Sequence, residues 1–231
     1  MILSKAGRAD IIEKIMKKSS KKPIYWHCSC GKTHVKGPQK ITIIAMRHGE
    51  SEHNVLKIVN GDPKKQFHIT PKGRKQALEL SRKLKSRQIS AIIASQMKRT
   101  QDTAEPLAKI KKLKIQVDKR LNDIGAGKLE GTSIDEFRKL TGNIHKSVKG
   151  SETGKHVANR LKDFLKDVLQ YYTGKTVVVV SSEIILHSLK QIAAGEFSDE
   201  NVGHHINNAK IYEFHLHSPI CCRSCGDYCE I

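Results

Sequence analysis

The feature that most constrains this chain is a short apolar run that ends abruptly in charge. Residues 41–46, ITIIAM, are uncharged and rich in β-branched side chains, and the sequence Arg47-His48-Gly49-Glu50 follows directly. This composition predicts a strand that is buried on both faces of a sheet. Open α/β sheets bind their ligands just past the carboxyl ends of such strands. We therefore expect a ligand site at this point of the chain.

The residue types at this strand end favour phosphoryl chemistry. Arg47 is a permanent cation, and Arg is the preferred residue for bidentate contacts to phosphate. The same cation lowers the pKa of the neighbouring imidazole, which keeps His48 neutral and nucleophilic. Gly49 allows the backbone to pass close to a ligand or to adopt a positive φ.

Polar residues also follow three other apolar runs, at residues 90–94, 114–118 and 176–181, which we expect to be further strands. The polar residues that follow the four strands are, in chain order, Arg47 with His48, Arg99, Asp123 and Ser182. Because the carboxyl ends of parallel strands meet at the same edge of a sheet, these side chains are expected to form one site. Two Arg and one His at that edge imply a phosphoryl group as the ligand.

The motif Arg47-His48-Gly49-Glu50-Ser51, with Asn54 three residues further on, resembles the signature of the histidine phosphatase superfamily, also called the phosphoglycerate-mutase-like family. Four later segments match the family in order, so that the resemblance covers about Ile41 to His217. They are ITPKGRKQA at 69–77, Ser-x-x-x-Arg-Thr-x-x-Thr-Ala at 95–104, the segment 123–131, and Gly150 to Thr153 followed by Arg160. The resemblance implies an α/β three-layer sandwich, in which helices cover both faces of a mostly parallel central sheet.

The resemblance also implies a role for each site residue. His48 attacks the phosphoryl group and forms a phosphohistidine, while Arg47, Asn54 and Arg99 bind the phosphate. Asp123 protonates the departing oxygen, at a position where the family more often has Glu. Glu130 is the alternative acid, although it matches a structural Glu-Gly pair of the family. The resemblance implies no metal or organic cofactor for catalysis.

The chain departs from the family at its last site strand. The family ends this strand with Ser-His-Gly, and its second His also binds the phosphoryl group; this chain has Ser181-Ser182-Glu183. Ser182 can donate a hydrogen bond to phosphate but cannot carry positive charge. Glu183 brings a negative charge toward the site, or points away along the following helix. The loss of one preorganised donor typically costs about 10²–10³ in rate.

Two functions therefore remain open at this site. One is a slow phosphomonoester phosphatase acting on a phosphorylated small molecule or a phosphoprotein. The other is a catalytically inactive, phosphate-binding pseudoenzyme. A phosphoglycerate mutase is disfavoured, because the long insertion that mutases carry after Gly131 is missing from this chain.

The charge of the chain supports a third hypothesis, a nucleic-acid-associated basic protein with a zinc-ribbon-like staple between its termini. The net charge is +19 and the isoelectric point about 9.7, as in many nucleic-acid-binding proteins. The Lys residues are spread along the chain, which favours an ordinary solvated surface instead.

The chain has neither an apolar run long enough to span a bilayer nor a signal peptide pattern. We therefore expect a cytoplasmic protein without a membrane partner.

All six Cys lie outside the phosphatase-like region. We expect three parts: an extension at 1–40 with an amphipathic helix near 4–18 and a Cys-x-Cys turn, the domain at 41–217, and a Cys-rich tail at 218–231. Two Cys turns at opposite ends of the chain resemble the halves of a zinc ribbon. Their candidate ligands are Cys28, Cys30, Cys222 and Cys225. Free surface thiols are the alternative, and a zinc with four protein ligands would be structural rather than catalytic.

Overall fold

The computed structural model describes residues 24–27, 33–36, 40–195, 197 and 208–217. The chain divides into two units, Lys40–Leu216 and a second unit of Met1–Gln39 with His217–Ile231. In the second unit the structure describes an antiparallel pair of strands, β1 (Ile24–His27) and β2 (Thr33–Lys36). The helix expected near 4–18 and the four candidate zinc ligands lie outside the described residues.

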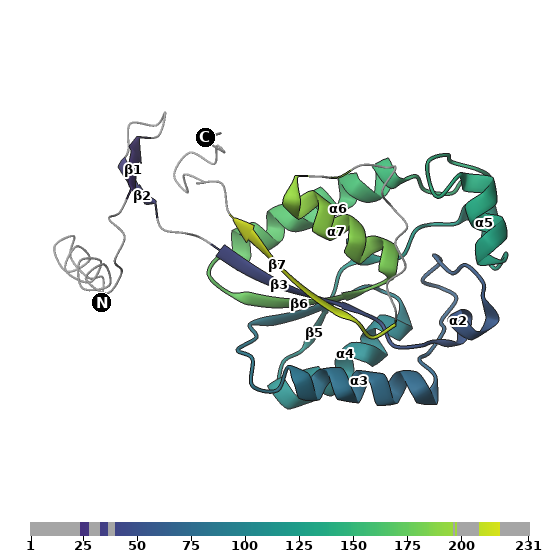
Figure 1. The fold of residues 1–231 in the computed structure, drawn as a ribbon, viewed down its shortest axis with the longest axis horizontal. Coiled ribbons are helices and arrows are strands. Elements are labelled where there is room, and N and C mark those ends of the chain that lie inside the picture. The colour runs from purple at the N-terminus through teal and green to yellow at the C-terminus, as the bar shows by residue number, and fades with distance from the viewer. Residues whose placement is uncertain (1–23, 28–32, 37–39, 196, 198–207, 218–231) are drawn as a thin grey trace. The chain divides into compact units, whose positions relative to one another are not determined.

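The larger unit is built on a five-stranded sheet with the order β5-β4-β6-β3-β7. The strands are β3 (Lys40–Arg47), β4 (Ala91–Ala94), β5 (Ile115–Val117), β6 (Thr176–Ser181) and β7 (Ile211–His217). The pairs β3–β6, β4–β6 and β4–β5 are parallel. Figure 1 shows the edge strand β7 running in the opposite direction to β3. The predicted mostly parallel sheet is confirmed.

Helices cover both faces of this sheet, so the predicted three-layer sandwich is also confirmed (Figure 1). One face carries α3 (Pro71–Lys83) and α4 (Lys98–Lys111), and the other carries α6 (Gly154–Tyr171) and α7 (Glu183–Ala194). The smaller elements are α2 (Glu52–Leu56), α5 (Ile134–Thr141) and the 3-10 turns η1 (Lys119–Leu121) and η2 (Gly127–Leu129). Within the described part of the chain, none of the helices combines the length and the apolar character that a membrane span requires.

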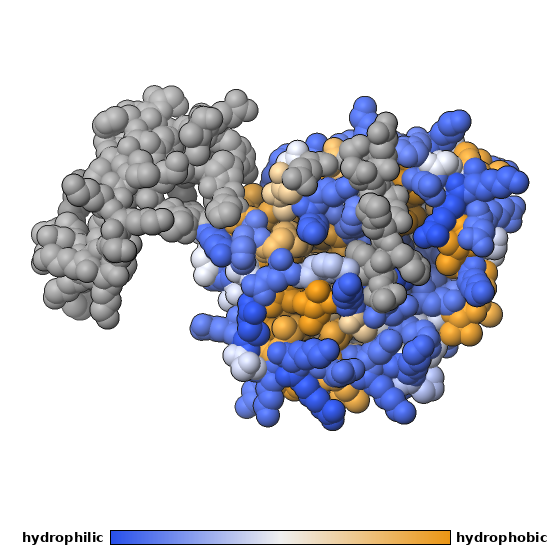
Figure 2. Space-filling model, in the orientation of Figure 1, coloured by the Kyte–Doolittle hydropathy of each residue, from blue (hydrophilic) through white to orange (hydrophobic). Residues whose placement is uncertain are grey.

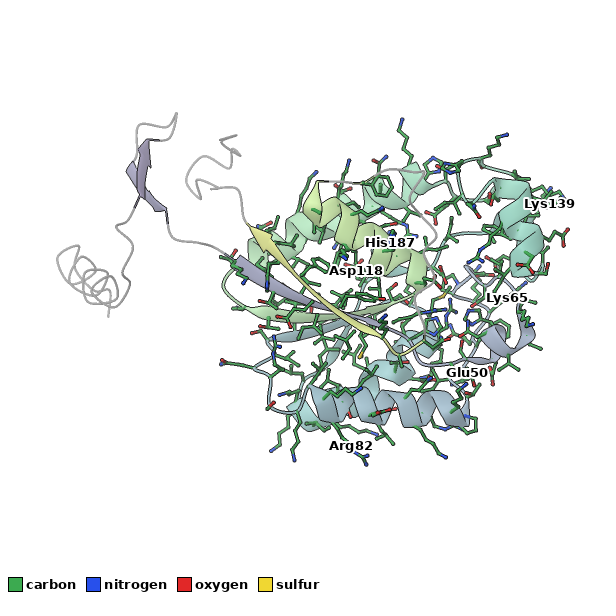
Figure 3. The ribbon with its side chains drawn as sticks, viewed as in Figure 1. Glu50, Lys65, Arg82, Asp118, Lys139 and His187 are labelled. Carbon is green, nitrogen blue, oxygen red and sulfur yellow. The ribbon has the colours of Figure 1, made fainter. Side chains whose placement is uncertain are left out.

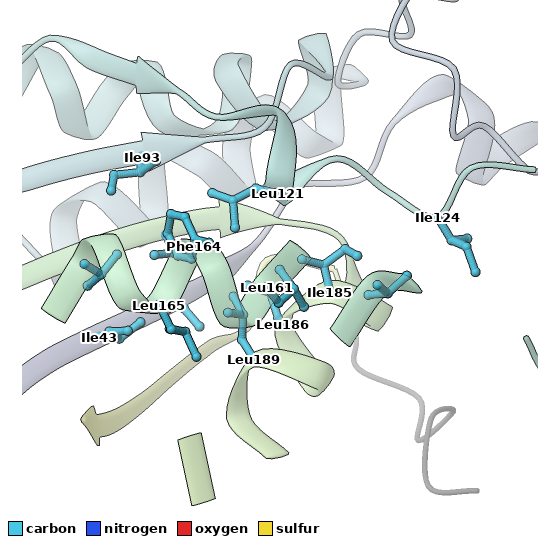
Figure 4. Close-up of a cluster of buried hydrophobic side chains, with 14 of the residues drawn as sticks. Ile43, Ile93, Leu121, Ile124, Leu161, Phe164, Leu165, Ile185, Leu186 and Leu189 are labelled. Atoms are coloured by element: carbon cyan, nitrogen blue, oxygen red, sulfur yellow. The ribbon is translucent and has the colours of Figure 1, made fainter. Parts of the chain in front are cut away.

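The strand β3 is buried on both faces, as its unbroken apolar sequence predicts. Successive strand residues point to opposite faces of a sheet. Ile43 and Ala45 pack with α6 and α7, where Phe164 lies at the centre of the cluster in Figure 4. Ile44 and Met46 pack on the other face with α3 and α4. Burial on both faces fixes the strand, and with it the position of the polar residues at its carboxyl end.

The helix starts follow the sequence signals for capping. Thr70 Oγ1 accepts a hydrogen bond from the backbone N–H of Gly73, with Pro71 at the first helical position of α3. Ser133 caps α5 in the same way. The short helix α2 was not predicted, because five residues are too few for a hydrophobic period to appear.

Candidate active site

Three strands end at the same level of the sheet. The register pairs Arg47 of β3 with Ser181 of β6, and Ala94 of β4 with Val180 of β6. The ladder continues one residue further, where the His48 N–H donates to the Ser181 carbonyl over 3.1 Å. The residues that follow β3, β4 and β6 therefore meet at one edge, as predicted.

His48 is held as a neutral imidazole with one nitrogen available. Its Nδ1 lies 2.7 Å from the carbonyl oxygen of Gly49, and because a carbonyl only accepts, Nδ1 carries the proton and Nε2 the lone pair. The side chain is 1% exposed. This burial, followed by the charges of Arg99, His53 and Arg47, holds the pKa of His48 well below its usual 6.5. These are the properties of a nucleophile.

Gly49 allows the loop after β3 to pack closely on α3. It does not have the positive φ that the sequence allowed for. A Cβ at this position would lie 2.7 Å from the carbonyl oxygen of Gly73, so the loop after β3 packs directly on the first turn of α3. The Gly49 N–H also donates to Thr103 Oγ1 over 3.0 Å, which joins the loop to α4.

Glu50 also holds the loop after β3 against the start of α3. Its carboxylate accepts a hydrogen bond from Thr70 Oγ1 over 2.9 Å and pairs with Lys72 Nζ over 2.8 Å. Figure 3 shows Glu50 beside the start of α3. The motif residues after His48 thus position the histidine by binding its loop to α3 and α4.

Arg99 is a buried cation on the first turn of α4. Its side chain is 1% exposed. Nη1 donates to Asn60 Oδ1 over 2.6 Å, and Nη2 donates to the Asn60 carbonyl and to Asp123 Oδ2, each over 3.0 Å. The sequence indicated Arg99 but not Asn60, because Asn60 lies in a loop whose composition carries no signal for this contact.

Asp123 connects the other site residues. Oδ1 accepts hydrogen bonds from Ser182 Oγ over 2.8 Å and from the Ile124 N–H over 2.9 Å, while Oδ2 faces Arg99. Ser182, expected to contact phosphate, therefore donates to a carboxylate in this structure. Glu130, the alternative acid, accepts from the backbone N–H groups of Gly61 and Ala126, and these are structural contacts.

Of the two orientations that the sequence left open for Glu183, the structure shows the one that faces the site. Its Oε2 lies 3.0 Å from Arg47 Nη1, with the two side chains 12% and 10% exposed. The cause is the sheet order, because β6 lies beside β3 and the first residue of α7 therefore lies beside the end of β3. A buried cation at that place attracts the nearest carboxylate.

Each of the two site arginines keeps one donor without a partner. Arg47 Nε and Arg99 Nε are both buried, and neither has a hydrogen-bond partner within the part of the chain that the structure describes. Buried N–H groups in proteins are nearly always bonded. Two such donors on cations beside His48 fit the oxygens of an anionic ligand.

A second histidine, His53, lies next to the first and was not predicted. Its ring centroid is 5.5 Å from that of His48. Burial, followed by the charge of Arg99, lowers the pKa of His53 to about 3. Its two ring nitrogens contact Ser51 Oγ over 2.7 Å and Asn54 Nδ2 over 3.1 Å. In the sequence nothing distinguishes this His from the chain's other histidines.

Asn54 has structural contacts in addition to its predicted contact with phosphate. Its Oδ1 accepts hydrogen bonds from Ser51 Oγ and from Asn208 Nδ2, each over 3.0 Å. Asn208 also donates to the His48 carbonyl over 3.3 Å. Asn208 comes from the segment just before β7, so a residue distant in sequence helps to hold the loop that carries His48.

Four of the six predicted residues of the phosphate site line one cavity of about 330 Å³. Arg47, Asn54, Asp123 and Ser182 all line this cavity. Arg99 is linked to it through Asp123, and His48 lies against His53, another lining residue. Two cations and a neutral nucleophilic imidazole at such a cavity can bind a phosphoryl group and accept it from an ester.

Known proteins share this sequence pattern and fold. A family model described as the histidine phosphatase superfamily (branch 1) matches residues 43–219. Phosphoserine phosphatase 1 from Hydrogenobacter thermophilus is 31% identical over 160 residues, which cover 64% of this chain and 74% of that protein. A probable phosphoglycerate mutase, GpmB, from Salmonella choleraesuis is 27% identical over 164 residues, which cover 67% of this chain and 75% of the relative.

Solved structures with the same fold include a mycobacterial glucosyl-3-phosphoglycerate phosphatase. It superposes with a TM-score of 0.67 at 21% identity, covering 76% of this chain and 90% of that structure. All the site residues described above, from Arg47 to Glu183, lie within the region that the family model matches.

Proposed function

The chain belongs to the histidine phosphatase superfamily, and on this premise we propose that it hydrolyses phosphate monoesters through a phosphohistidine on His48. One observation carries the proposal. A neutral imidazole, with Nδ1 fixed by the Gly49 carbonyl, lies at a strand end beside two buried arginines, and the Nε of each has no hydrogen-bond partner among the residues that the structure describes.

The first step is binding of the phosphate by the two arginines. Arg47 and Arg99 now contact the carboxylates of Glu183 and Asp123. A phosphate dianion carries more charge than either carboxylate and presents more acceptor oxygens, so it can take the free Nε donors and compete for the others. Asn54, at the wall of the cavity, adds a side-chain amide.

The second step transfers the phosphoryl group. His48 Nε2 attacks phosphorus, a P–N bond forms, and the P–O bond to the leaving group breaks opposite it. Asp123 in its protonated form gives its proton to the departing oxygen. The positive charge that develops on the ring is stabilised at Nδ1–H by the Gly49 carbonyl. Water then attacks phosphorus, Asp123 takes its proton, and inorganic phosphate leaves with Nε2 free again.

A second candidate function has its own observation. Glu183 pairs with Arg47, and Ser182 stands where the resemblance places the second His of the family. Both changes weaken anion binding where the transition state needs it. A pseudoenzyme that binds phosphorylated ligands without turnover is therefore the alternative.

Hydrolysis of p-nitrophenyl phosphate by four proteins tests both candidates: the parent, His48→Ala, Ser182→His and Ser182→His/Glu183→Gly. We expect slow turnover by the parent, none by His48→Ala and faster turnover by Ser182→His. As a control, His68→Ala removes an exposed histidine that pairs with Asp102 and should leave the rate unchanged. Full activity in His48→Ala would contradict the proposal. No turnover by the parent, together with turnover by Ser182→His/Glu183→Gly, would favour the pseudoenzyme.

A further inference from the structure

The cavity beside the phosphate site has a polar end and an apolar wall. The polar end is formed by Arg47, Asp123 and Ser182. The apolar wall comes from α5 and the turn after it, from the loop after α2, and from α7. Its principal side chains are Ile58, Ile134, Phe137, Ile144 and Ile184. A leaving group attached to a phosphate at the polar end would therefore lie against branched aliphatic side chains, one aromatic ring and the neutral amide of Asn143 in the turn after α5.

The charged side chains that line this cavity are either paired with an opposite charge or exposed to solvent. Among the described residues that line the cavity, the carboxylates are those of Asp123 and Glu183, and each pairs with an arginine. Both carboxylates lie beside the phosphate-binding end, so an ammonium group on the leaving group would find no carboxylate among the lining residues of α5 and the turn after it. Arg138 also lines the cavity, but it is exposed to solvent, where a cation contributes little to binding.

The apolar character extends to the surface near this wall. Figure 2 shows hydrophobic residues at the right of the domain, near α5 and α2, as one of several hydrophobic areas on this face. Val55 and Leu56 of α2, three and two positions before Ile58 in the chain, are 62% and 59% exposed. The volume of about 330 Å³ lies at the small end of the range for ligand pockets, so the group that fits is compact.

We propose that the substrate is a phosphate monoester of a compact apolar alcohol, with an aromatic or branched aliphatic body that packs against Ile134 and Phe137. This inference rests on the proposed phosphatase function and names the substrate class of the same site. It separates this chain from a phosphatase that recognises the amino or carboxylate group of phosphoserine or 3-phosphoglycerate.

The test compares esters whose leaving groups are all primary alcohols, so that leaving-group chemistry differs little. The probes are 2-phenylethyl phosphate, ethyl phosphate, phosphoserine and 3-phosphoglycerate. An apolar group in a fitting pocket is worth about tenfold or more in kcat/KM. We expect 2-phenylethyl phosphate to exceed each of the other three by at least that factor. A preference for phosphoserine or 3-phosphoglycerate would overturn the inference.

A matched pair of variants on α5 tests the wall itself. Ile134 lines the cavity and is only partly buried, so Ile134→Asn should leave the fold intact. Leu140, on the same helix, is 39% exposed and is not a lining residue, so Leu140→Asn is the control. We expect Ile134→Asn to lower kcat/KM about tenfold for 2-phenylethyl phosphate and less than twofold for ethyl phosphate. Equal effects on both esters, or the same effect in Leu140→Asn, would contradict the assignment.

Binding measurements separate this inference from the proposed function. Calorimetry with 2-phenylethylphosphonate and ethylphosphonate, which resist hydrolysis, reports the preference of the pocket without turnover. If no ester is hydrolysed but the phenylethyl ligand binds about tenfold more tightly, the phosphatase proposal fails and the apolar specificity stands. If turnover is observed and the two ligands bind equally, the phosphatase proposal stands and the apolar specificity fails.

Discussion

Arg47 Nη1 and Glu183 Oε2 lie 3.0 Å apart at the meeting point of two strand ends. The arginine ends β3, and the glutamate begins the helix that follows β6. The pair neutralises a cation that the proposed mechanism needs for phosphate. Binding of a phosphoryl group and the Arg47–Glu183 ion pair therefore compete with each other.

Glu183→Gln should lower KM for p-nitrophenyl phosphate by about tenfold, with a smaller change in kcat. A full negative charge a few ångströms from the phosphate costs on the order of several kcal/mol at the effective dielectric of a protein surface, and rearrangement recovers part of this. Glu136→Gln, which removes an exposed carboxylate on the first turn of α5, is the control and should leave KM unchanged. An unchanged or higher KM in Glu183→Gln would show that the pair does not compete with substrate.

Asp123→Asn should slow the hydrolysis of esters with poor leaving groups more than the hydrolysis of esters with good leaving groups. Asn can still accept a hydrogen bond from Arg99 through Oδ1, with its NH2 group facing Ser182 Oγ, but it cannot supply a proton to the departing oxygen. We expect kcat for ethyl phosphate to fall about 10²–10⁴-fold, a typical contribution of general acid catalysis. The fall for p-nitrophenyl phosphate should be much smaller, because its phenolate leaves without protonation. Steady-state kinetics with both esters measure this difference. An equal fall in kcat for the two esters would show that a residue other than Asp123 is the general acid.

The buried histidines should make stability depend on pH. Burial lowers the pKa of His53 to about 3 and that of His48 below 6.5. Between about 3 and 6.5 the unfolded chain binds protons that the folded chain does not, so the free energy of unfolding falls as the pH falls through that window. One such histidine accounts for about 2 kcal/mol between pH 7 and pH 5.

Urea unfolding at pH 7 and pH 5 measures this dependence. His53→Gln should remove about 2 kcal/mol of the difference between the two pH values. His145→Gln, at an exposed histidine, should keep the full difference. If His53→Gln and His145→Gln retain the same pH dependence, His53 is not held neutral by the fold.

Gly49→Ala should destabilise the protein by about 1–3 kcal/mol, a typical cost of overpacking. The added Cβ would lie 2.7 Å from the Gly73 carbonyl oxygen, which is backbone and cannot move without α3. Gly125→Ala is the matched control, because there the nearest atom is a flexible side-chain carbon of Glu152 at 3.4 Å. Thermal unfolding of both variants tests the comparison, and equal melting temperatures would contradict the packing role of Gly49.

The sequence predicted the sheet and the convergence of its polar residues because these features depend on short-range signals. A buried parallel strand is an unbroken apolar run, and residues just past such runs must meet at one edge. Arg47, Arg99, Asp123 and Ser182 were found in this way. Thr70 and Pro71 indicated the start of α3, because helix capping is also a short-range signal.

The contacts between these residues could not be predicted, because they join segments far apart in the chain. Asn60 contacts Arg99 from a loop, and Asn208 reaches Asn54 across more than half of the domain. The direction of Glu183 depends on the strand order, which places α7 beside the end of β3. No periodic pattern in the sequence records that order.

The most direct test of the account is detection of the covalent intermediate. Enzyme mixed with p-nitrophenyl phosphate is quenched within milliseconds into alkali, where phosphohistidine survives, and the peptides are mapped by mass spectrometry. We expect a phosphoryl group on the peptide that contains His48, at the same level in His68→Gln and absent in His48→Asn. Turnover without any phosphorylated peptide, or a phosphoryl group on another residue, would contradict it.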